Sequence, residues 1–212
     1  MAKIQLESNR TFYLTLTSMI QSLAMGYLLT SIDFTAMPPI ADVLQAVATF
    51  TLIILVWHEY AISTMLFVWV VDLWDSVIPF VFGFTEFFII STLNTRKFGS
   101  EWWFIGLSGF AIVSVLAFIN QYSKSAAHKE NDFAVSLLRP HSKKTIVFVM
   151  ASAVTFFVEG VIAHSSGRKG WAFFVLVLVA TGTCIGFSSR EVFLYPKIMR
   201  KIVNRYASSS RP

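Results

Sequence analysis

The chain has little charge and only one cysteine. Of its 212 residues 14% are charged, whereas 55% are hydrophobic and the mean hydropathy is +0.64. A single cysteine excludes an intrachain disulfide framework and a thiolate metal cluster, and Cys184 is expected to be a small, buried apolar residue. A soluble core of this size could not bury so much apolar surface, which places the chain in a lipid bilayer.

Motifs of the common enzyme classes are also missing. The sequence contains no G-x-S-x-G, Walker, G-x-G-x-x-G or H-E-x-x-H pattern. The four histidines are dispersed, and no two of them stand four residues apart as metal ligands on one helix face would. We therefore expect no metal, no cofactor and no enzymatic activity. A membrane enzyme or sensor that uses buried acids for proton chemistry is a third alternative that lacks a partner motif.

Six apolar segments are long enough to cross a bilayer, for which about 20 residues are needed. They are residues 12–32, 39–61, 64–92, 102–122, 145–164 and 171–189. Because no Gly or Pro occurs between Pro39 and Pro79, the break between the second and third segments is placed as a tight turn at residues 60–64. The expected fold class is all-α, a polytopic transmembrane helix bundle in one domain (residues 1–212).

The distribution of basic residues predicts the orientation of the chain. With six spans and both termini on the inner side, 13 of the 17 Lys and Arg residues lie inside and four lie outside. Basic residues are retained on the cytoplasmic side, so a cytoplasmic loop (residues 123–144) and a basic cytoplasmic tail (residues 190–212) are expected. The net charge of +5 then reflects topology and attraction to anionic lipid, and no nucleic-acid partner is expected. The plasma membrane is the expected location.

Four acids inside the apolar segments are the candidates for chemistry. An ionised side chain at the bilayer centre costs about 2.5–3.5 kcal/mol on insertion scales, so such acids normally face a protein interior or a water path. With a third helix that starts near residue 64, Asp72 and Asp75 would lie deepest, and Glu86 would lie near the opposite interface. Glu159 on the fifth helix could complete a polar interior. Alternatively, these acids bond neighbouring helices and hold the bundle together.

Smaller polar and glycine patterns occur on other helices. Ser18 and Ser22 share a face of the first helix with Gln21 beside them, which is typical of close helix packing or of a water-lined path. Gly182 and Gly186 form a G-x-x-x-G pair, which indicates helix contact within the chain or between subunits. His58 and Glu59 are interpreted as anchors at the inner interface; metal binding is their alternative role.

Two helix ends resemble a known channel family. The second segment ends in Trp57 and His58 and the third contains Pro79 and Phe80, a pattern similar to the six-helix potassium channels of lysosomes and bacteria. Six helices with both termini inside also agree with that family. Its first helix carries an Arg and a Phe-Ser-Asp motif, whereas here Arg10 is followed by TFYLTLTSM. No filter residues are therefore transferred.

The sequence as a whole predicts an integral membrane protein that self-associates and provides a path for an ion or a small solute. In this interpretation Asp72, Asp75, Glu86 and Glu159 line the path, and Gln21, Ser18 and Ser22 add neutral polar contacts. The alternative is a non-conducting membrane subunit. Its helices, basic loop and basic tail would bind a cytoplasmic protein or anionic lipid.

Overall fold

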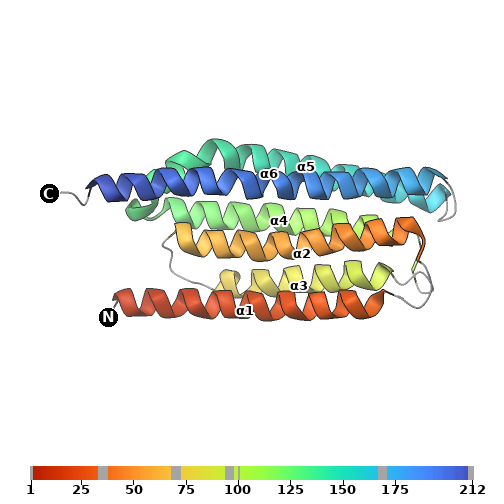
Figure 1. Cartoon of the computed structure of the whole chain (residues 1–212), viewed down its shortest axis with the longest axis horizontal. Helices are drawn as coiled ribbons and strands as arrows, with labels where there is room; N and C mark the ends of the chain where they lie inside the picture. Colours follow the sequence, from red (N-terminus) through yellow and green to blue (C-terminus); the bar gives the residue numbers. More distant parts are fainter. Residues whose placement is uncertain are drawn as a thin grey trace.

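The computed structural model of the chain is a helix bundle (Figure 1). It describes the backbone of residues 2–32, 38–67, 73–93, 98–99, 101–166 and 171–209, with side chains at residues 11–202 of these ranges and at residue 204. The elements are α1 (Ala2–Ser31), α2 (Ile40–Leu66), α3 (Leu73–Leu93), α4 (Trp102–Ala126), η1 (Lys129–Asn131), α5 (Asp132–Ser166) and α6 (Trp171–Ser209). No strand occurs in these ranges, so the predicted all-α class is confirmed.

Each of the six α-helices contains a stretch that is long and apolar enough to cross a membrane. Consecutive helices run in opposite directions, so α1 begins and α6 ends at the same end of the bundle, on the left in Figure 1. We call this the termini end. The predicted count of six spans is confirmed, and the chain is a multi-pass membrane protein. Which side of the membrane the termini face stays a prediction.

The helices form three layers of two. α1 and α3 make one outer layer, α2 and α4 lie in the middle, and α5 and α6 make the other outer layer (Figure 1). α1 packs on α2 and α3, α4 packs on α3 and α5, and α6 packs on α2 and α5. Outward faces are apolar: Phe84 is 75% exposed, Val154 65% and Leu116 60%. Such faces are stable in contact with lipid, because their exposure to water would be unfavourable.

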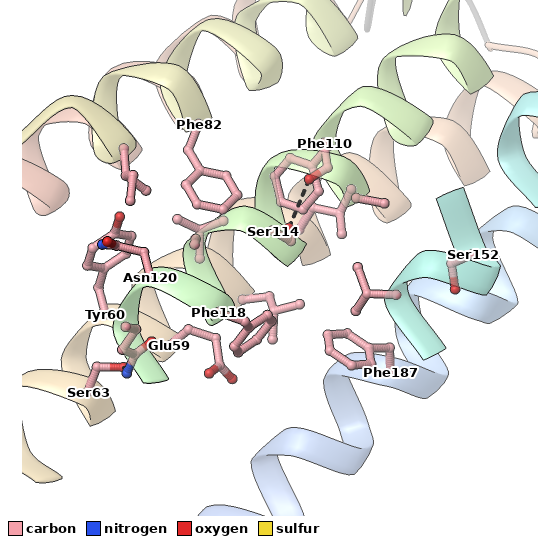
Figure 2. A pocket seen from close by; sticks show the side chains of 18 of the residues that line it. Glu59, Tyr60, Ser63, Phe82, Phe110, Ser114, Phe118, Asn120, Ser152 and Phe187 are labelled. Atoms are coloured by element: carbon pink, nitrogen blue, oxygen red, sulfur yellow. Dashed lines mark hydrogen bonds between the residues drawn. The ribbon is translucent and has the colours of Figure 1, made fainter. Parts of the chain in front are cut away.

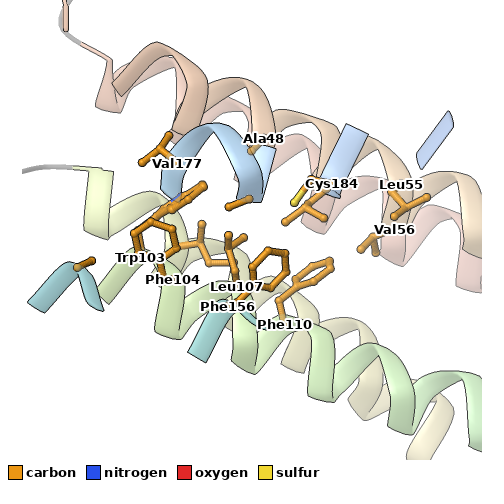
Figure 3. Packing of buried hydrophobic residues seen from close by; sticks show 14 of the residues in the cluster. Ala48, Leu55, Val56, Trp103, Phe104, Leu107, Phe110, Phe156, Val177 and Cys184 are labelled. Atoms are coloured by element: carbon orange, nitrogen blue, oxygen red, sulfur yellow. The ribbon is translucent and has the colours of Figure 1, made fainter. Parts of the chain in front are cut away.

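The main core joins buried side chains of α2, α3, α4, α5 and α6 (Figure 3). Trp103 and Phe104 on α4 are completely buried, and their rings meet edge to face with centroids 5.1 Å apart. The indole Nε1 of Trp103 donates a hydrogen bond to Thr49 Oγ1 on α2 at 3.3 Å. This bond satisfies the one polar atom of the largest buried side chain.

The boundary between the second and third helices differs from the prediction. α2 continues through residues 60–64 and ends at Leu66, where the backbone of Phe67 turns to an extended conformation. The predicted tight turn at residues 60–64 is therefore wrong, and α3 begins only at Leu73. The sequence offers no Gly or Pro here, and apolar residues continue on both sides of the break. Without a polar or glycine signal, composition alone could not place the helix end.

Much of the loop before the fifth span is helical, and the sixth helix continues into the tail. Most of the predicted cytoplasmic loop at residues 123–144 is helical, because α4 extends to Ala126 and α5 starts at Asp132. α6 continues through the basic segment as far as Ser209. The two helical extensions form a second small core in which Ala134 and Leu138 of α5 join Tyr195, Ile198 and Ile202 of α6. The bundle therefore continues at the termini end beyond the predicted spans.

Two glycines permit close helix contacts. A Cβ atom at Gly83 would lie 2.7 Å from Ile20 Cγ2, and one at Gly106 would lie 2.8 Å from Ile89 Cγ1. Both distances are shorter than van der Waals contact. Gly83 therefore sets the approach of α3 to α1, and Gly106 sets the approach of α4 to α3.

Candidate site: a cavity inside the bundle

A cavity of about 120 Å³ lies between the helices, and residues from all six helices line it (Figure 2). Along α4 the lining runs from Leu107 to Lys124, about 26 Å at 1.5 Å per residue. The cavity is partly open to the exterior. At the end away from the termini it meets the packed core around Trp103 and Phe104. Trp103 and Phe104 are not among the lining residues, and Leu107 is the first α4 residue of the lining.

Most of the cavity wall is apolar and aromatic. Phe82 extends into it from α3, Phe110 and Phe118 line it on α4, and Phe187 lines it on α6 (Figure 2). The few hydroxyls in this region bond to their own helices: Ser114 donates to the Phe110 carbonyl at 2.9 Å, and Ser152 donates to the Phe148 carbonyl at 3.0 Å. A wall of this kind suits an apolar solute, because it offers few oxygen atoms to replace the water around an ion.

Charged and amide side chains gather at the termini end of the cavity. Lys124 Nζ on α4 lies 2.9 Å from Asp75 Oδ2 on α3, and Asn120 Nδ2 donates a hydrogen bond to Asp75 Oδ1 at 3.1 Å. Gln121 Nε2 donates to Ser63 Oγ on α2. The side chains of Asp75 and Lys124 are 11% and 21% exposed. This polar end offers a cation, a carboxylate and amides within one region, so it can hydrogen-bond polar groups of several kinds.

The structure corrects the predicted depth of the acids. Asp75 lies in the first turn of α3, at the termini end, because that helix starts at Leu73 rather than near residue 64. Glu86, which the sequence placed near an interface, is well inside α3 and only 1% exposed. Glu86 is thus the deeply buried acid of this helix. Asp72, the other residue predicted to be deep, lies outside the described residues.

Glu86 lies next to α1 and is not among the residues that line the cavity. The Gln21 side chain on α1 approaches the Glu86 carboxyl group without reaching regular hydrogen-bond geometry. Gln21 is 6% exposed. Within the described part of the chain, neither carboxyl oxygen of Glu86 has a hydrogen-bond partner. Gln21, which was predicted to add a neutral polar contact to the path, lies instead at the α1–α3 contact and outside the cavity lining.

The other first-helix candidates also lie away from the cavity. Ser22 is exposed and donates a hydrogen bond to the Ser18 carbonyl at 2.7 Å. Ser18 Oγ accepts a hydrogen bond from Trp57 Nε1 on α2 at 3.1 Å. Tyr13 is the one α1 residue in the lining. The stripe therefore makes contacts within and between helices, while Asp75 is the one described candidate among the predicted path residues that lines the cavity.

Glu159 is buried on α5, at 5% exposure, but does not line the cavity. It lies close enough to Cys184 on α6 to act on the thiol electrostatically. Cys184 itself is 3% exposed and does line the cavity. Glu159 and Asp75 are therefore not brought together in one polar interior.

Near the other end of the bundle, His164 Nδ1 lies 3.2 Å from Glu101 Oε1.

His58 and Glu59 lie on α2, where they meet α6. The Tyr195 hydroxyl donates a hydrogen bond to Glu59 Oε2 at 2.7 Å, and the rings of His58 and Tyr195 pack edge to face. His58 Nδ1 is 3.8 Å from Glu59 Oε1. Among the described residues, no group of three or more His, Cys, Asp and Glu side chains could hold a metal ion. The pair therefore ties α2 to α6.

Several residues of the polar end have no role in the sequence-based prediction. Lys124 was counted only as a basic residue outside the membrane, and Asn120 and Gln121 were not singled out. One signal was present: an amide pair one turn before a lysine at the end of an apolar helix forms a polar cluster on that helix. Its partner Asp75 is 49 positions earlier in the chain, and no local pattern predicts that pairing.

Comparison of the chain with protein-family models, with curated proteins and with solved structures found no match.

Proposed function

We propose that this membrane protein is a carrier for a small amphipathic solute, which it binds in the cavity between its helices. The observation that carries the proposal is the division of the cavity into two parts. Its body is lined by six phenylalanines, and its termini end holds Asp75, Lys124 and Asn120. An apolar body with a few convergent polar groups is typical of small-molecule sites.

The same cavity argues against simple ion conduction. Ion paths replace the hydration shell with rings of carbonyl or charged groups along the pore. Here the wall is mostly apolar and includes six phenylalanines, and Trp103 and Phe104 pack in the core beside it. We infer that this core closes one end of the cavity, which would suit a carrier, since the site of a carrier must open to one side of the membrane at a time.

Transport of two permanently charged aromatic probes tests this function. Phenyltrimethylammonium and benzenesulfonate carry the same ring with opposite charges, so passive leak is low and the sign of the head group is resolved. We expect vesicles that contain the protein to exchange at least one probe. Rubidium ions should leak no faster than from protein-free vesicles.

Two neighbouring α4 residues supply the matched variants. Ala117 is partly buried and lines the cavity, whereas Leu116 is 60% exposed on the outer face. Ala117→Phe should fill the cavity and stop probe exchange, and Leu116→Phe should leave it unchanged. Rubidium flux without probe exchange would favour an ion channel of the kind that the helix ends resemble. Exchange that is equal in both variants would place the solute elsewhere.

A non-transporting role is the second candidate. Exposed basic residues at the termini end support it, because they can contact anionic headgroups or an acidic protein. They are Arg139, Lys143 and Lys144 on α5 and Lys197, Arg200 and Lys201 on α6. This function would be favoured if vesicles that contain the folded protein pass neither probe nor rubidium.

Self-association is part of the proposal. Gly182 and Gly186 on α6 are exposed, and nothing lies within 4 Å of a Cβ atom built at either position. This G-x-x-x-G face is therefore not used within the chain. A small-residue face of this kind suits close packing against a helix of a second copy in the bilayer.

A further inference from the structure

Glu86 is a buried acid without a counter-ion. Its residue exposure is 1%, and neither carboxyl oxygen has a hydrogen-bond partner among the described residues. It stands 13 residues after the start of the 21-residue α3, about 20 Å along the helix axis. Burial of an isolated carboxylate in such a place is very costly, whereas burial of the neutral acid is not.

Among the described side chains, no Lys, Arg or His of the packed helices forms an ion pair with Glu86. Residues 11–32 of α1, 43–57 of α2 and 102–123 of α4 contain no Asp, Glu, Lys, Arg or His. Lys124 at the end of α4 is bound to Asp75, and His58 and Glu59 of α2 contact Tyr195 on α6. Among the described side chains, the other titratable groups of α1 to α4 are Tyr13, Tyr27, Tyr60, Asp75, Asp42 at the start of α2 and Tyr122 near the end of α4.

One stripe of α3 connects Glu86 to the cavity. Asp75, Ile78, Phe82 and Glu86 follow one another at three- and four-residue steps, so they share a helix face. The first three line the cavity, and Glu86 is one turn beyond Phe82. Phe82 and Tyr60 pack edge to face with ring centroids 6.4 Å apart (Figure 2). These two rings lie between the polar end and the buried acid.

We propose that Glu86 is an internal proton-binding site that exchanges with the cavity past Phe82 and Tyr60, and that it couples solute movement to proton movement. One proton from water binds a Glu86 oxygen to give the neutral acid, and the same proton leaves when water reaches the carboxyl group. Gln21 is the polar neighbour that can hydrogen-bond either form. The coupling rests on the proposed carrier function; the proton site itself does not.

Chemical modification tests the proton site directly. Dicyclohexylcarbodiimide is apolar and adds to protonated carboxyl groups in apolar surroundings. With the full-length protein in detergent, peptide mass spectrometry should find Glu86 modified, more in acidic than in alkaline buffer. Asp75 should stay unmodified because it is paired with Lys124. A Glu86 that remains unmodified in acidic buffer would overturn the proposal, and this result needs no variant to fold.

Probe uptake driven by a pH gradient tests the coupling. Wild-type vesicles should accumulate the transported aromatic probe when a gradient is imposed. Glu86→Gln should keep probe exchange without a gradient but lose the gradient-driven accumulation. Glu159→Gln is the matched control, because Glu159 is also buried but does not lie on the cavity stripe. Gradient-driven uptake that persists in Glu86→Gln would overturn the coupling while leaving the carrier function intact. Absence of any exchange in wild type would instead overturn the carrier function.

Discussion

At the scale of single residues, the ion pair of Asp75 with Lys124 affects both the stability of the fold and the candidate site. Both side chains are mostly buried, and Asn120 binds the same carboxylate. Water screens such a pair poorly, so the loss of one charge would leave the other buried without compensation. The pair also closes the polar end of α3 onto α4. It therefore stabilises the fold and provides the charged groups of the candidate site.

Lys124→Met should lower the free energy of unfolding by about 1–3 kcal/mol, less than the range for fully buried pairs because some solvent reaches both groups. The methionine keeps most of the apolar stem but leaves Asp75 without its cation. Thermal unfolding in detergent, followed by size-exclusion chromatography, measures the loss.

Two variants control this result. Asp75→Asn combined with Lys124→Met should recover most of the stability, because no isolated charge remains. Lys129→Met should have little effect, since Lys129 is exposed. If Lys124→Met were as stable as wild type, the ion pair would not contribute to the fold.

The depths and the partners of these acids could not be predicted from the sequence. Asp75 and Glu86 could be identified from the sequence as unusual, because a charged residue inside an apolar segment is recognisable without a structure. Their depths depended on where α3 starts, and an error of nine residues in that start exchanged the two acids between interface and interior. Their partners come from other helices, and only the packing of α3 on α1 and α4 supplies them.

At the scale of helices, close approach matters more than length. Six apolar stretches could be read from the sequence because a bilayer imposes about 20 residues per span. The glycine contacts could not be read in the same way. Gly83 lies against Ile20, whereas Gly182 is exposed with open space beside it, yet both stand in apolar helices. Which glycine is needed depends on the helix that it faces.

Gly83→Ala should therefore destabilise the bundle by about 1–3 kcal/mol, the usual cost of overpacking. The new Cβ would lie 2.7 Å from Ile20 Cγ2 and would force α1 and α3 apart. Gly182→Ala should be neutral or slightly stabilising, because alanine favours the helix and meets no atom. Thermal unfolding compares the two variants. Recovery in Ile20→Ala with Gly83→Ala would confirm the contact; an unchanged melting temperature for Gly83→Ala alone would contradict it.

At the scale of the whole molecule, the outer surface determines whether the protein self-associates. Its exposed residues are mostly apolar and suit lipid, but the Gly182–Gly186 face of α6 also suits a close helix contact. Replacing both glycines by leucine should leave the monomer folded, because no described atom of another residue lies within 4 Å of a Cβ added at either position. The same change should remove self-association if this face forms the contact.

Cross-linking in native membranes and mass determination in nanodiscs measure this effect. Wild type should yield dimers or larger species, and Gly182→Leu with Gly186→Leu should yield monomers. Gly109 offers a control, since it too has no atom within 4 Å of an added Cβ but lies on α4. Oligomers that survive the α6 replacement would exclude this face.

The short third helix also links the protein to the thickness of its membrane. α3 has 21 residues, about 31 Å, and so barely matches the hydrocarbon layer of about 30 Å. α5 and α6 have 35 and 39 residues and can slide or tilt to meet a thicker layer. In lipids with longer chains, the hydrocarbon layer would be thicker than α3 is long. Asp75 in the first turn of α3 would then lie closer to the hydrocarbon. The lipid itself would then set the strength of the ion pair at the cavity's polar end.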